Sequence, residues 1–415
     1  MIGDGMGPAY TSTYRYYKDG NTSDNIRSTV FDEMLVGKNS TYSQNSVITD
    51  SAAAGTALAT GYKTKNGFIG VKDNTNAQTV LEYAKENGYM TAMAVTSTLT
   101  HATPAAFLST KGLHRDNESE IAKDFFTLNK NGQLKFNFLI GAGEIYFSEA
   151  YKDFNLTAKN NNIKIYRDAY NFENISSYPF IAFTSYDYAP YAIDEKEENR
   201  YRVAEMTKKS LALLADKPFF LMIESSQIDW CGHVNDIACA MAEMEDFERS
   251  VILAKKYVDR HPNTLLIVTA DHSTGGLSIG KKIKKDDKTI TQEQRSKSYI
   301  WYPEVIKQIK ASAIKIAKEI RKSADINNTF KTYTSITLQA DEYAELNTAL
   351  IKKDKKIRKI VTSIINKHSN TGWTTHGHTA VDVETFAYGK GSEKFRGFLD
   401  NTDIAKKIFE VLSDK

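Results

Sequence analysis

An apolar run at residues 263–268, followed closely by an acid and an imidazole, places the strongest constraint on how this chain folds. The run is mainly leucine and β-branched residues, which predicts a buried parallel strand. Asp271 and His272 stand where that strand would end. In open α/β sheets, ligands bind beyond the carboxyl ends of the strands. Two neighbouring metal-ligand side chains at that place therefore predict a zinc site at one edge of the sheet.

The same arrangement occurs twice more. A second apolar run, at 218–223, precedes Glu224, and it is followed by Asp229 and His233. These last two residues are four apart, so they share one face if a helix begins there. Asp4 lies between two glycines, directly after what reads as the final residues of a strand.

A fourth candidate lies near the C-terminus, where His376 and His378 precede an alternating segment at 380–387. Carboxylates and imidazoles from four distant places, all at element ends, predict a multinuclear metal centre. Each piece alone has a simpler interpretation. Asp-His after a strand is more often a solvated turn, Gly-Asp-Gly is usually a turn, and the Asp/His pair is more often a surface pair. The metal prediction depends on their joint occurrence.

Ser51 is the candidate nucleophile. Small helix-forming residues follow it up to position 61, so it would lie near a helix N-terminus, where free N–H groups and the dipole favour an anion. The simpler interpretation is that Asp50 or Ser51 only caps the helix. A capping serine becomes reactive if a bound zinc ion lowers its pKa.

Taken together, these motifs resemble those of the alkaline phosphatase family. They occur in the family's order and span nearly the whole chain: Asp4 in 2–7, Ser51 in 49–53, the segment His101–Ala105, Glu224 with Asp229 and His233, the segment Thr269–His272, and His378 with Thr379.

The resemblance implies a role for each matching residue. Asp229, His233 and His378 would hold a first zinc ion, and Asp4, Asp271 and His272 a second one that also takes the oxygen of Ser51. Asp4 would also bridge to a magnesium ion held by Thr103 and Glu224. Oxygen ligands suit magnesium and imidazole suits zinc, in agreement with this division. Arg115 is the best match for the arginine that binds the phosphate, since its fork can reach two oxygens at once.

Two positions depart from the best-known bacterial form of the family. His101 stands where that form has an aspartate near magnesium, and Trp230 stands where it has a lysine. We expect His101 to act on magnesium through water, and we expect both His101 and Trp230 to surround the ligands without being ligands themselves. His376 is a tempting further ligand, but the family motif indicates the histidine that precedes Thr379.

The implied activity is hydrolysis of small-molecule phosphate monoesters through a covalent phosphoserine, with two Zn²⁺ and one Mg²⁺ as cofactors. A sulfatase would need Pro and Arg after its nucleophile, and Ser51 has neither. A phosphodiesterase of the same superfamily often uses threonine and a different phosphate clamp. A zinc- and phosphate-binding relative without activity is the remaining alternative.

The expected fold is α/β, with a mostly parallel central sheet and helices on both faces. Residues 1–280 and 374–415 would form the catalytic core, and the lysine-rich, mostly helical residues 281–373 a crown-like insertion over the site. The net charge of +3 argues against nucleic acid as a partner, and no apolar stretch has membrane-spanning length. The lysine runs at 281–285 and 352–356 are best interpreted as solvated surface.

Helical spacing would place Cys231 and Cys239 too far apart for a disulfide, so we expect free thiols. Only Met1 and Ile2 precede the glycine before Asp4, which suggests that the chain starts inside the first strand of a longer protein. Any export signal would then lie upstream. Family resemblance implies a periplasmic or secreted homodimer.

Overall fold

The computed structural model describes residues 1–19, 26–73, 75–109, 111–167, 175, 177–215, 217–280, 300–351 and 356–413. The lysine run at 281–285 and residues 352–355 of the second run lie outside these ranges.

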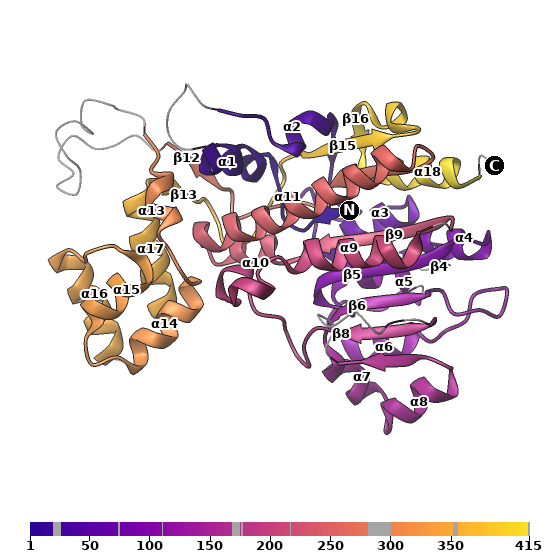
Figure 1. Ribbon diagram of the computed structural model, residues 1–415, viewed down its shortest axis with the longest axis horizontal. Coiled ribbons are helices and arrows are strands. Elements are labelled where there is room, and N and C mark those ends of the chain that lie inside the picture. Colours follow the sequence, from indigo (N-terminus) through magenta and orange to yellow (C-terminus); the bar gives the residue numbers. More distant parts are fainter. Residues whose placement is uncertain are drawn as a thin grey trace.

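A ten-stranded sheet forms the centre of the molecule (Figure 1). Across the sheet its strands are β16 (Gly397–Asp400), β2 (Leu35–Ser40), β15 (Val383–Gly389), β10 (Leu265–Thr269), β1 (Ile2–Gly3), β9 (Phe219–Ser225), β5 (Met90–Thr98), β6 (Phe138–Ala142), β8 (Phe180–Phe183) and β7 (Lys164–Tyr166). From β10 to β7 all neighbours are parallel, whereas β15 is antiparallel to both β10 and β2. The mostly parallel α/β fold expected from the sequence is therefore confirmed.

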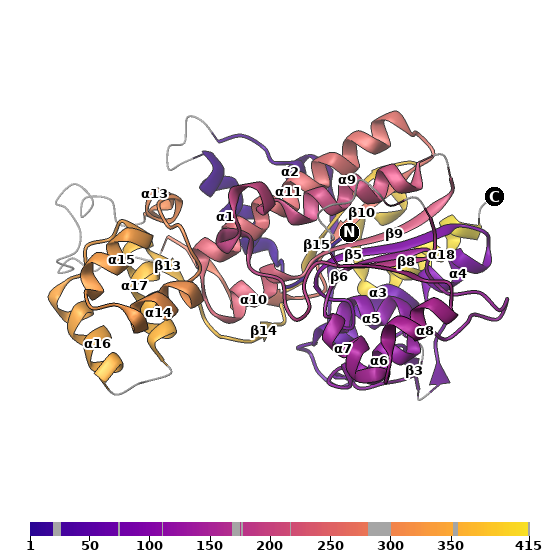
Figure 2. The same cartoon turned by 60° about the horizontal axis from the view of Figure 1, so that its bottom comes forward.

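Helices cover both faces of the sheet (Figure 2). One face carries α1 (Pro8–Asp19), α2 (Val30–Met34), α9 (Arg202–Leu214), α10 (Gln227–His233) and α11 (Ile237–Arg260). The opposite face carries α3 (Ser51–Thr60), α4 (Val80–Glu86), α5 (Ala102–Leu108), α6 (Glu118–Asp124), α7 (Glu144–Ala150), α8 (Phe154–Asn160) and α18 (Asn401–Ser413).

The pleat of β5 shows why both faces need cover. Ala92 and Ala94 pack into the hydrophobic cluster on the α11 side, while Met93 and Val95 pack into the cluster on the α3 side. Successive side chains of a strand point to opposite faces, so a strand apolar at every position must be buried on both. This is the pattern from which the buried strands were predicted.

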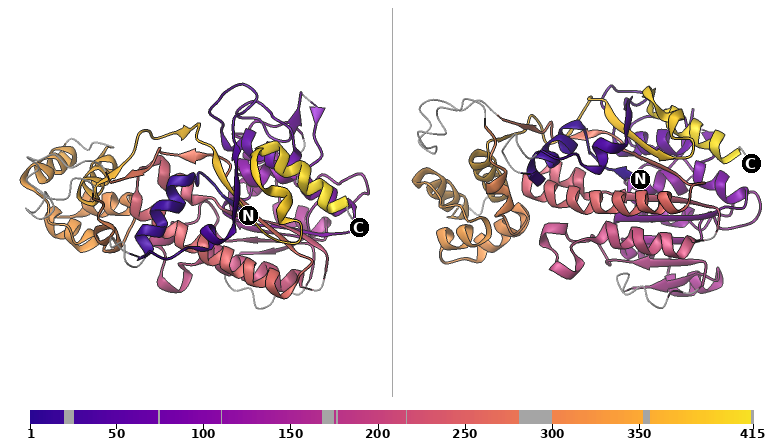
Figure 3. Two further views of the ribbon diagram at one scale, coloured as in Figure 1. Left: turned by 90° about the horizontal axis from the view of Figure 1, so that it is seen from above. Right: turned by 45° about the horizontal axis from the view of Figure 1, so that its top comes forward.

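A group of helices lies at one end of the molecule, beyond the sheet (Figure 3). It consists of α13 (Pro303–Lys307), α14 (Ala313–Lys322), α15 (Ile326–Thr334), α16 (Ala340–Ile351) and α17 (Ile357–Ser369). A short ribbon of β12 (Ser278–Ile279) and β13 (Thr371–Gly372) pairs the two connections to the core. The helices agree with the helical period read in this segment, while its treatment as a separate crown-like insertion stays a prediction.

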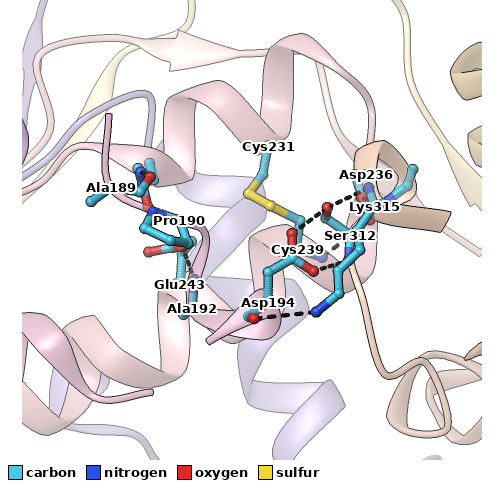
Figure 4. The surroundings of a disulfide bond; sticks show 12 residues. Ala189, Pro190, Ala192, Asp194, Cys231, Asp236, Cys239, Glu243, Ser312 and Lys315 are labelled. Carbon is cyan, nitrogen blue, oxygen red and sulfur yellow. Dashed lines mark hydrogen bonds between the residues drawn. A yellow bond between two sulfur atoms is a disulfide. The ribbon is translucent and has the colours of Figure 1, made fainter. Parts of the chain in front are cut away.

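The expectation of free thiols was wrong, because Cys231 and Cys239 form a disulfide (Figure 4). The expectation assumed one continuous helix. Instead α10 ends at His233, the chain turns through Asn235 at a φ of 56°, and a new helix begins at Ile237. The turn brings the two Cα atoms to 5.5 Å, which is within disulfide range.

Candidate metal centre

Three adjacent strands bring the first acidic residues together. β1 is the central strand, and Ile2 pairs with Glu224 of β9 on one side and with Thr269 of β10 on the other. Asp4 follows β1 and Asp271 follows β10, so both side chains project from the same carboxyl edge at which β9 ends. Gly5 lies between them at a φ of 71°, and a Cβ there would lie 2.8 Å from the Cα of Asp229. The close approach of these segments therefore requires glycine.

The remaining ligand candidates come from a helix and a small ribbon. α10 begins directly after β9 and carries Asp229 and His233. The ribbon pairs β11 (Ser273–Thr274) with β14 (His378–Thr379), with Thr274 opposite His378. This pairing explains how a histidine near the C-terminus reaches the Asp-His motif of β10. The ring centroids of His272 and His378 are 3.6 Å apart.

In each of the three histidines, Nδ1 contacts an oxygen atom that is not a candidate ligand. The Nδ1 of His378 lies 2.8 Å from the carbonyl oxygen of Thr49, and that of His233 lies 2.5 Å from the carbonyl oxygen of His376. The Nδ1 of His272 lies 3.2 Å from the hydroxyl of Thr274. A carbonyl oxygen only accepts, so Nδ1 carries the proton in His378 and His233, and Nε2 is left as the free ligand atom.

The Nε2 atoms point at the carboxylates. The Nε2 of His272 lies 3.1 Å from Oδ2 of Asp271 and 3.5 Å from Oδ1 of Asp4. Those of His233 and His378 lie 3.3 Å and 3.7 Å from the two oxygens of Asp229. Among the described residues, three groups have ligand atoms within 4.8 Å of one another: Asp229 with His233 and His378, Asp4 with Asp229 and His272, and Asp4 with His101 and Glu224.

Several buried polar atoms here lack a hydrogen bond of ordinary geometry. They are both carboxylate oxygens of Asp4 and of Glu224, Oδ2 of Asp271, the hydroxyl of Thr103 and Nδ1 of His101. Buried polar groups without partners are rare and costly, and they require an explanation. Carboxylate and hydroxyl oxygens that converge with ring nitrogens in a buried site fit divalent cations. The residues present therefore fit a metal centre.

Electrostatics leads to the same conclusion. Burial, together with the charges of Asp271, Asp229 and Glu224, raises the pKa of Asp4 well above its usual range. Burial and the charge of Asp271 act in the same direction on the pKa of Glu224. Burial also raises the pKa of Asp271, to about 7. These acids would ionise fully only if nearby cations compensated their charge.

Ser51 opens α3 and faces this cluster. Its side-chain oxygen lies 3.1 Å from Nε2 of His272, and the residue is 1% exposed. Asp50 caps the helix by accepting a hydrogen bond from the N–H of Ala53. The capping interpretation is thus satisfied by Asp50, which leaves the hydroxyl of Ser51 directed at the metal-ligand candidates.

Arg115 lies beside the same helix terminus. Its Nη1 atom is 3.1 Å from Oδ2 of Asp50, and that oxygen also accepts from the N–H of Gly67. The side chain keeps 24% of its surface exposed, so it can reach a ligand above Ser51. The sequence had indicated Asp50 as a possible helix cap, but not as the partner of Arg115.

The structure also places the remaining predicted residues. Thr103 lies in α5 within the buried cluster, and His101 immediately precedes that helix. The rings of His101 and Trp230 meet edge to face, with centroids 5.8 Å apart. His376 does not join the cluster, since its Nδ1 lies 3.0 Å from the carbonyl oxygen of His233.

Sequence reasoning missed Thr274. Its hydroxyl donates to Oδ1 of Asp229 over 2.5 Å and lies next to Nδ1 of His272. It therefore links ligand candidates of both predicted zinc sites. The available signal was its position, two residues after His272 in a motif already recognised.

Comparison with known proteins agrees with this geometry. The family model described as alkaline phosphatase matches residues 1–413. The chain belongs to the alkaline phosphatase family. Alkaline phosphatase 3 of Bacillus subtilis is 40% identical, over 99% of this chain and 88% of its own length. The alkaline phosphatase of Schizosaccharomyces pombe is 30% identical, over 98% of this chain and 79% of its own length.

Solved alkaline phosphatases share the fold. The cold-active enzyme from Shewanella sp. has a TM-score of 0.88 and 37% identity, with 100% of this chain and 99% of that chain covered. The enzyme from the Antarctic bacterium TAB5 has a TM-score of 0.71 and 27% identity, with 99% and 96% covered. This member of the family is accordingly a metal-binding phosphoric monoester hydrolase. Among its described helices, none is long and apolar enough to cross a membrane.

Proposed function

We propose that this alkaline phosphatase hydrolyses phosphate monoesters through a covalent phosphoserine at Ser51, with two zinc ions and one magnesium ion bound beside it. The observation that carries the proposal is the position of the Ser51 hydroxyl, 3.1 Å from Nε2 of His272 at the edge of the cluster of buried ligand candidates. A helix N-terminus at the same place favours the phosphate.

The donor sets support this division of metals. Asp229, His233 and His378 offer one carboxylate and two imidazoles, a combination that suits zinc. Asp4, Asp271 and His272 offer two carboxylates and an imidazole for the second zinc. Glu224, Thr103 and Asp4 offer only oxygens, which suit magnesium.

The place of His101 is part of this proposal. One of its ring nitrogens and one oxygen atom each of Asp4 and Glu224 lie within 4.8 Å of one another. We assign it a contact with magnesium through water. The TAB5 enzyme offers a parallel, since two variants with a carboxylate in place of one histidine have Mg bound in its M3 site.

The protein's own groups then carry out a double displacement. Bound metal ions would supply positive charge that favours the ionised serine and neutralises the phosphate. The oxygen of Ser51 attacks phosphorus, the bond to the alcohol breaks, and the alcohol leaves with a proton. Water then cleaves the phosphoserine and releases phosphate. Two inversions give overall retention at phosphorus, and Arg115 holds two non-bridging oxygens throughout.

Charge favours a dianionic substrate. The four carboxylates of Asp4, Glu224, Asp229 and Asp271 do not cancel three divalent cations, and Arg115 adds a further positive charge. A monoester dianion matches this excess better than a diester anion does. A diesterase is therefore the second candidate. A decayed, non-catalytic relative is disfavoured, because the sequence contains every ligand residue that the family resemblance implies.

We extend the proposal to location and assembly. The disulfide between Cys231 and Cys239 supports an oxidising compartment, because structural disulfides are rare in reducing cytosol. We therefore propose that the enzyme works outside the cytoplasm, in the periplasm or secreted. Assembly as a homodimer is proposed from family membership alone.

Replacement of the nucleophile tests the proposed function. Ser51→Ala should lower kcat for an aryl monoester by several orders of magnitude while zinc and magnesium content stay unchanged, because the hydroxyl is absent but the ligands remain. Metal analysis and steady-state kinetics measure both. Ser148→Ala, an exposed position of α7, is the matched control and should behave as wild type. Near-normal turnover in Ser51→Ala would rule out this nucleophile.

A further inference from the structure

A cavity of about 600 Å³ opens beside the metal centre. His101, Arg115 and Trp230 line it and also belong to the candidate site, so the cavity is continuous with the place where phosphate would bind. The segment at 188–194 also lines the cavity and lies outside the proposed catalytic machinery; it forms a wall that includes Tyr188 and Tyr191. A phosphate held by Arg115 and Ser51 would place some part of the substrate within reach of this wall.

Aromatic rings form one side of the cavity. Trp230 follows the ligand candidate Asp229 on α10, and its ring meets Tyr188 edge to face, with centroids 5.6 Å apart at 78°. On its other side Trp230 meets His101. Tyr188 is 47% exposed, so much of its ring remains available to a ligand. Planar groups bind favourably against such rings, both by stacking and edge to face.

The segment that carries these tyrosines is fixed by a buried ion pair. Arg202 and Glu243 pair at 2.8 Å, and both side chains are fully buried. Arg202 also donates to the carbonyl oxygen of Pro190, and the N–H of Ala192 donates to Glu243 over 2.7 Å. Figure 4 shows this segment against α11. These contacts hold the wall in a fixed position against α11.

Further contacts anchor both ends of the wall. At one end the hydroxyls of Tyr188 and Tyr146 lie 2.9 Å apart. At the other end Asp194 accepts hydrogen bonds from the N–H and the hydroxyl of Ser312, at 2.8 Å and 2.6 Å (Figure 4). Ser312 caps α14, so the helices beyond the sheet help to hold the wall.

The charge in the cavity differs from that at the metal centre. Asp116, Glu118 and Asp194 line it, and Arg115 is the one permanently positive side chain among its described lining residues. Arg115 is assigned to the phosphate. Asp194 is engaged by Ser312, and Glu118 accepts from Thr98 and Thr100. The Oδ2 atom of Asp116 lies 3.4 Å from Nδ1 of His114, but the side chain is 80% exposed, so Asp116 is the carboxylate most accessible to a ligand.

We propose that this cavity binds the alcohol part of the substrate, and that it selects aromatic leaving groups, with a positively charged substituent preferred over a negative one. The proposal rests on the proposed function, because it needs a phosphate at Ser51. The aromatic rings supply the contact with a planar group, and Asp116 supplies the preference in charge.

The first test compares the wild-type enzyme with Tyr188→Ala on two substrates, phenyl phosphate and glycerol phosphate. The ratio kcat/KM covers only the steps up to formation of phosphoserine, so it reports contacts with the leaving group. Loss of one ring contact should lower kcat/KM for phenyl phosphate by roughly two- to tenfold. The kcat/KM for glycerol phosphate, which has no ring, should fall less than the kcat/KM for phenyl phosphate. Tyr188→Phe keeps the ring and should retain most of the difference.

The matched control is Tyr186→Ala in the same segment, since Tyr186 is 58% exposed and does not line the cavity. It should leave both substrates unchanged. Equal losses for both substrates in Tyr188→Ala, or no loss for either, would overturn the proposed pocket. Absence of turnover of both esters by the wild-type enzyme would instead contradict the proposed function.

The second test addresses charge. Wild-type enzyme should prefer an aryl monoester with a trimethylammonium substituent over one with a carboxylate, and Asp116→Asn should reduce this ratio of kcat/KM values. The exposed position of Asp116 limits the expected change to a few-fold. High salt should reduce the ratio in wild type more than in the variant. A preference for the anionic ester, or a ratio unchanged in Asp116→Asn, would contradict the charge selection.

Discussion

At the scale of single residues, the site depends on which atom of each histidine is free. His233 and His378 direct Nδ1 at carbonyl oxygens from distant segments, so Nε2 faces the acids. The sequence pointed to these ligand candidates because they cluster at element ends, but it gave no sign of the oxygen atoms that Nδ1 contacts. Every residue has a backbone carbonyl group, so only the fold shows that those of Thr49 and His376 contact these histidines.

The choice between the two C-terminal histidines gives a prediction. His378→Ala should weaken zinc binding and lower turnover strongly, because it removes an Nε2 ligand from the group with Asp229 and His233. His376→Ala should have a much smaller effect, because its backbone carbonyl, which meets His233, remains. Zinc content after dialysis against a chelator measures the difference. Equal metal loss in both variants would show that His376 also binds.

A second residue-scale prediction concerns Arg115. A monoester dianion presents three non-bridging oxygens and a diester only two, so Arg115→Ser should cost the monoester more, on the order of 2–3 kcal/mol for a charge-assisted pair. The preference for monoester over diester should narrow in kcat/KM. Arg321→Ser, an exposed position of α14, serves as control. Should the wild type prefer the diester, the assignment would move to the diesterase candidate.

At the scale of elements, the apolar runs at 218–223 and 263–268 predicted β9 and β10, since burial on both faces leaves a strong signal. The alternating segment at 380–387 corresponds to β15, within a few residues. The strands β2 and β16, of which β16 forms one edge of the sheet, were not predicted. Their sequences contain glycine and polar residues, and they become strands by pairing with β15 and with each other.

The disulfide between Cys231 and Cys239 was not predicted from the sequence spacing. It gives a third prediction. It ties α10, which carries Asp229 and His233, to the start of α11. Cys239→Ala should lower the free energy of unfolding by about 2–3 kcal/mol, as expected for closing a short loop. Thermal unfolding with and without reductant measures this effect, and the reductant should act on wild type but not on Cys239→Ala. Equal stability of both proteins would show that the link contributes nothing.

At the scale of the whole molecule, the order of the strands in the sheet differs from their order along the chain, and this difference brings the parts of the site together. Motifs from the first residues to position 378 meet because β1 lies between β9 and β10, and because β14 pairs with β11. Family resemblance anticipated this convergence. The cavity wall at 188–194 could not be anticipated, because its position depends on contacts with α11 and α14 that no local pattern records.

The central claim is that the phosphoryl group passes through Ser51. The most direct measurement is a rapid acid quench of the metal-loaded enzyme during turnover of an aryl monoester, followed by mass spectrometry of its peptides. We predict a phosphate on the peptide containing Ser51, absent from Ser51→Ala and from enzyme stripped of metal. Phosphate on another residue, or full turnover without any covalent phosphate, would contradict the account.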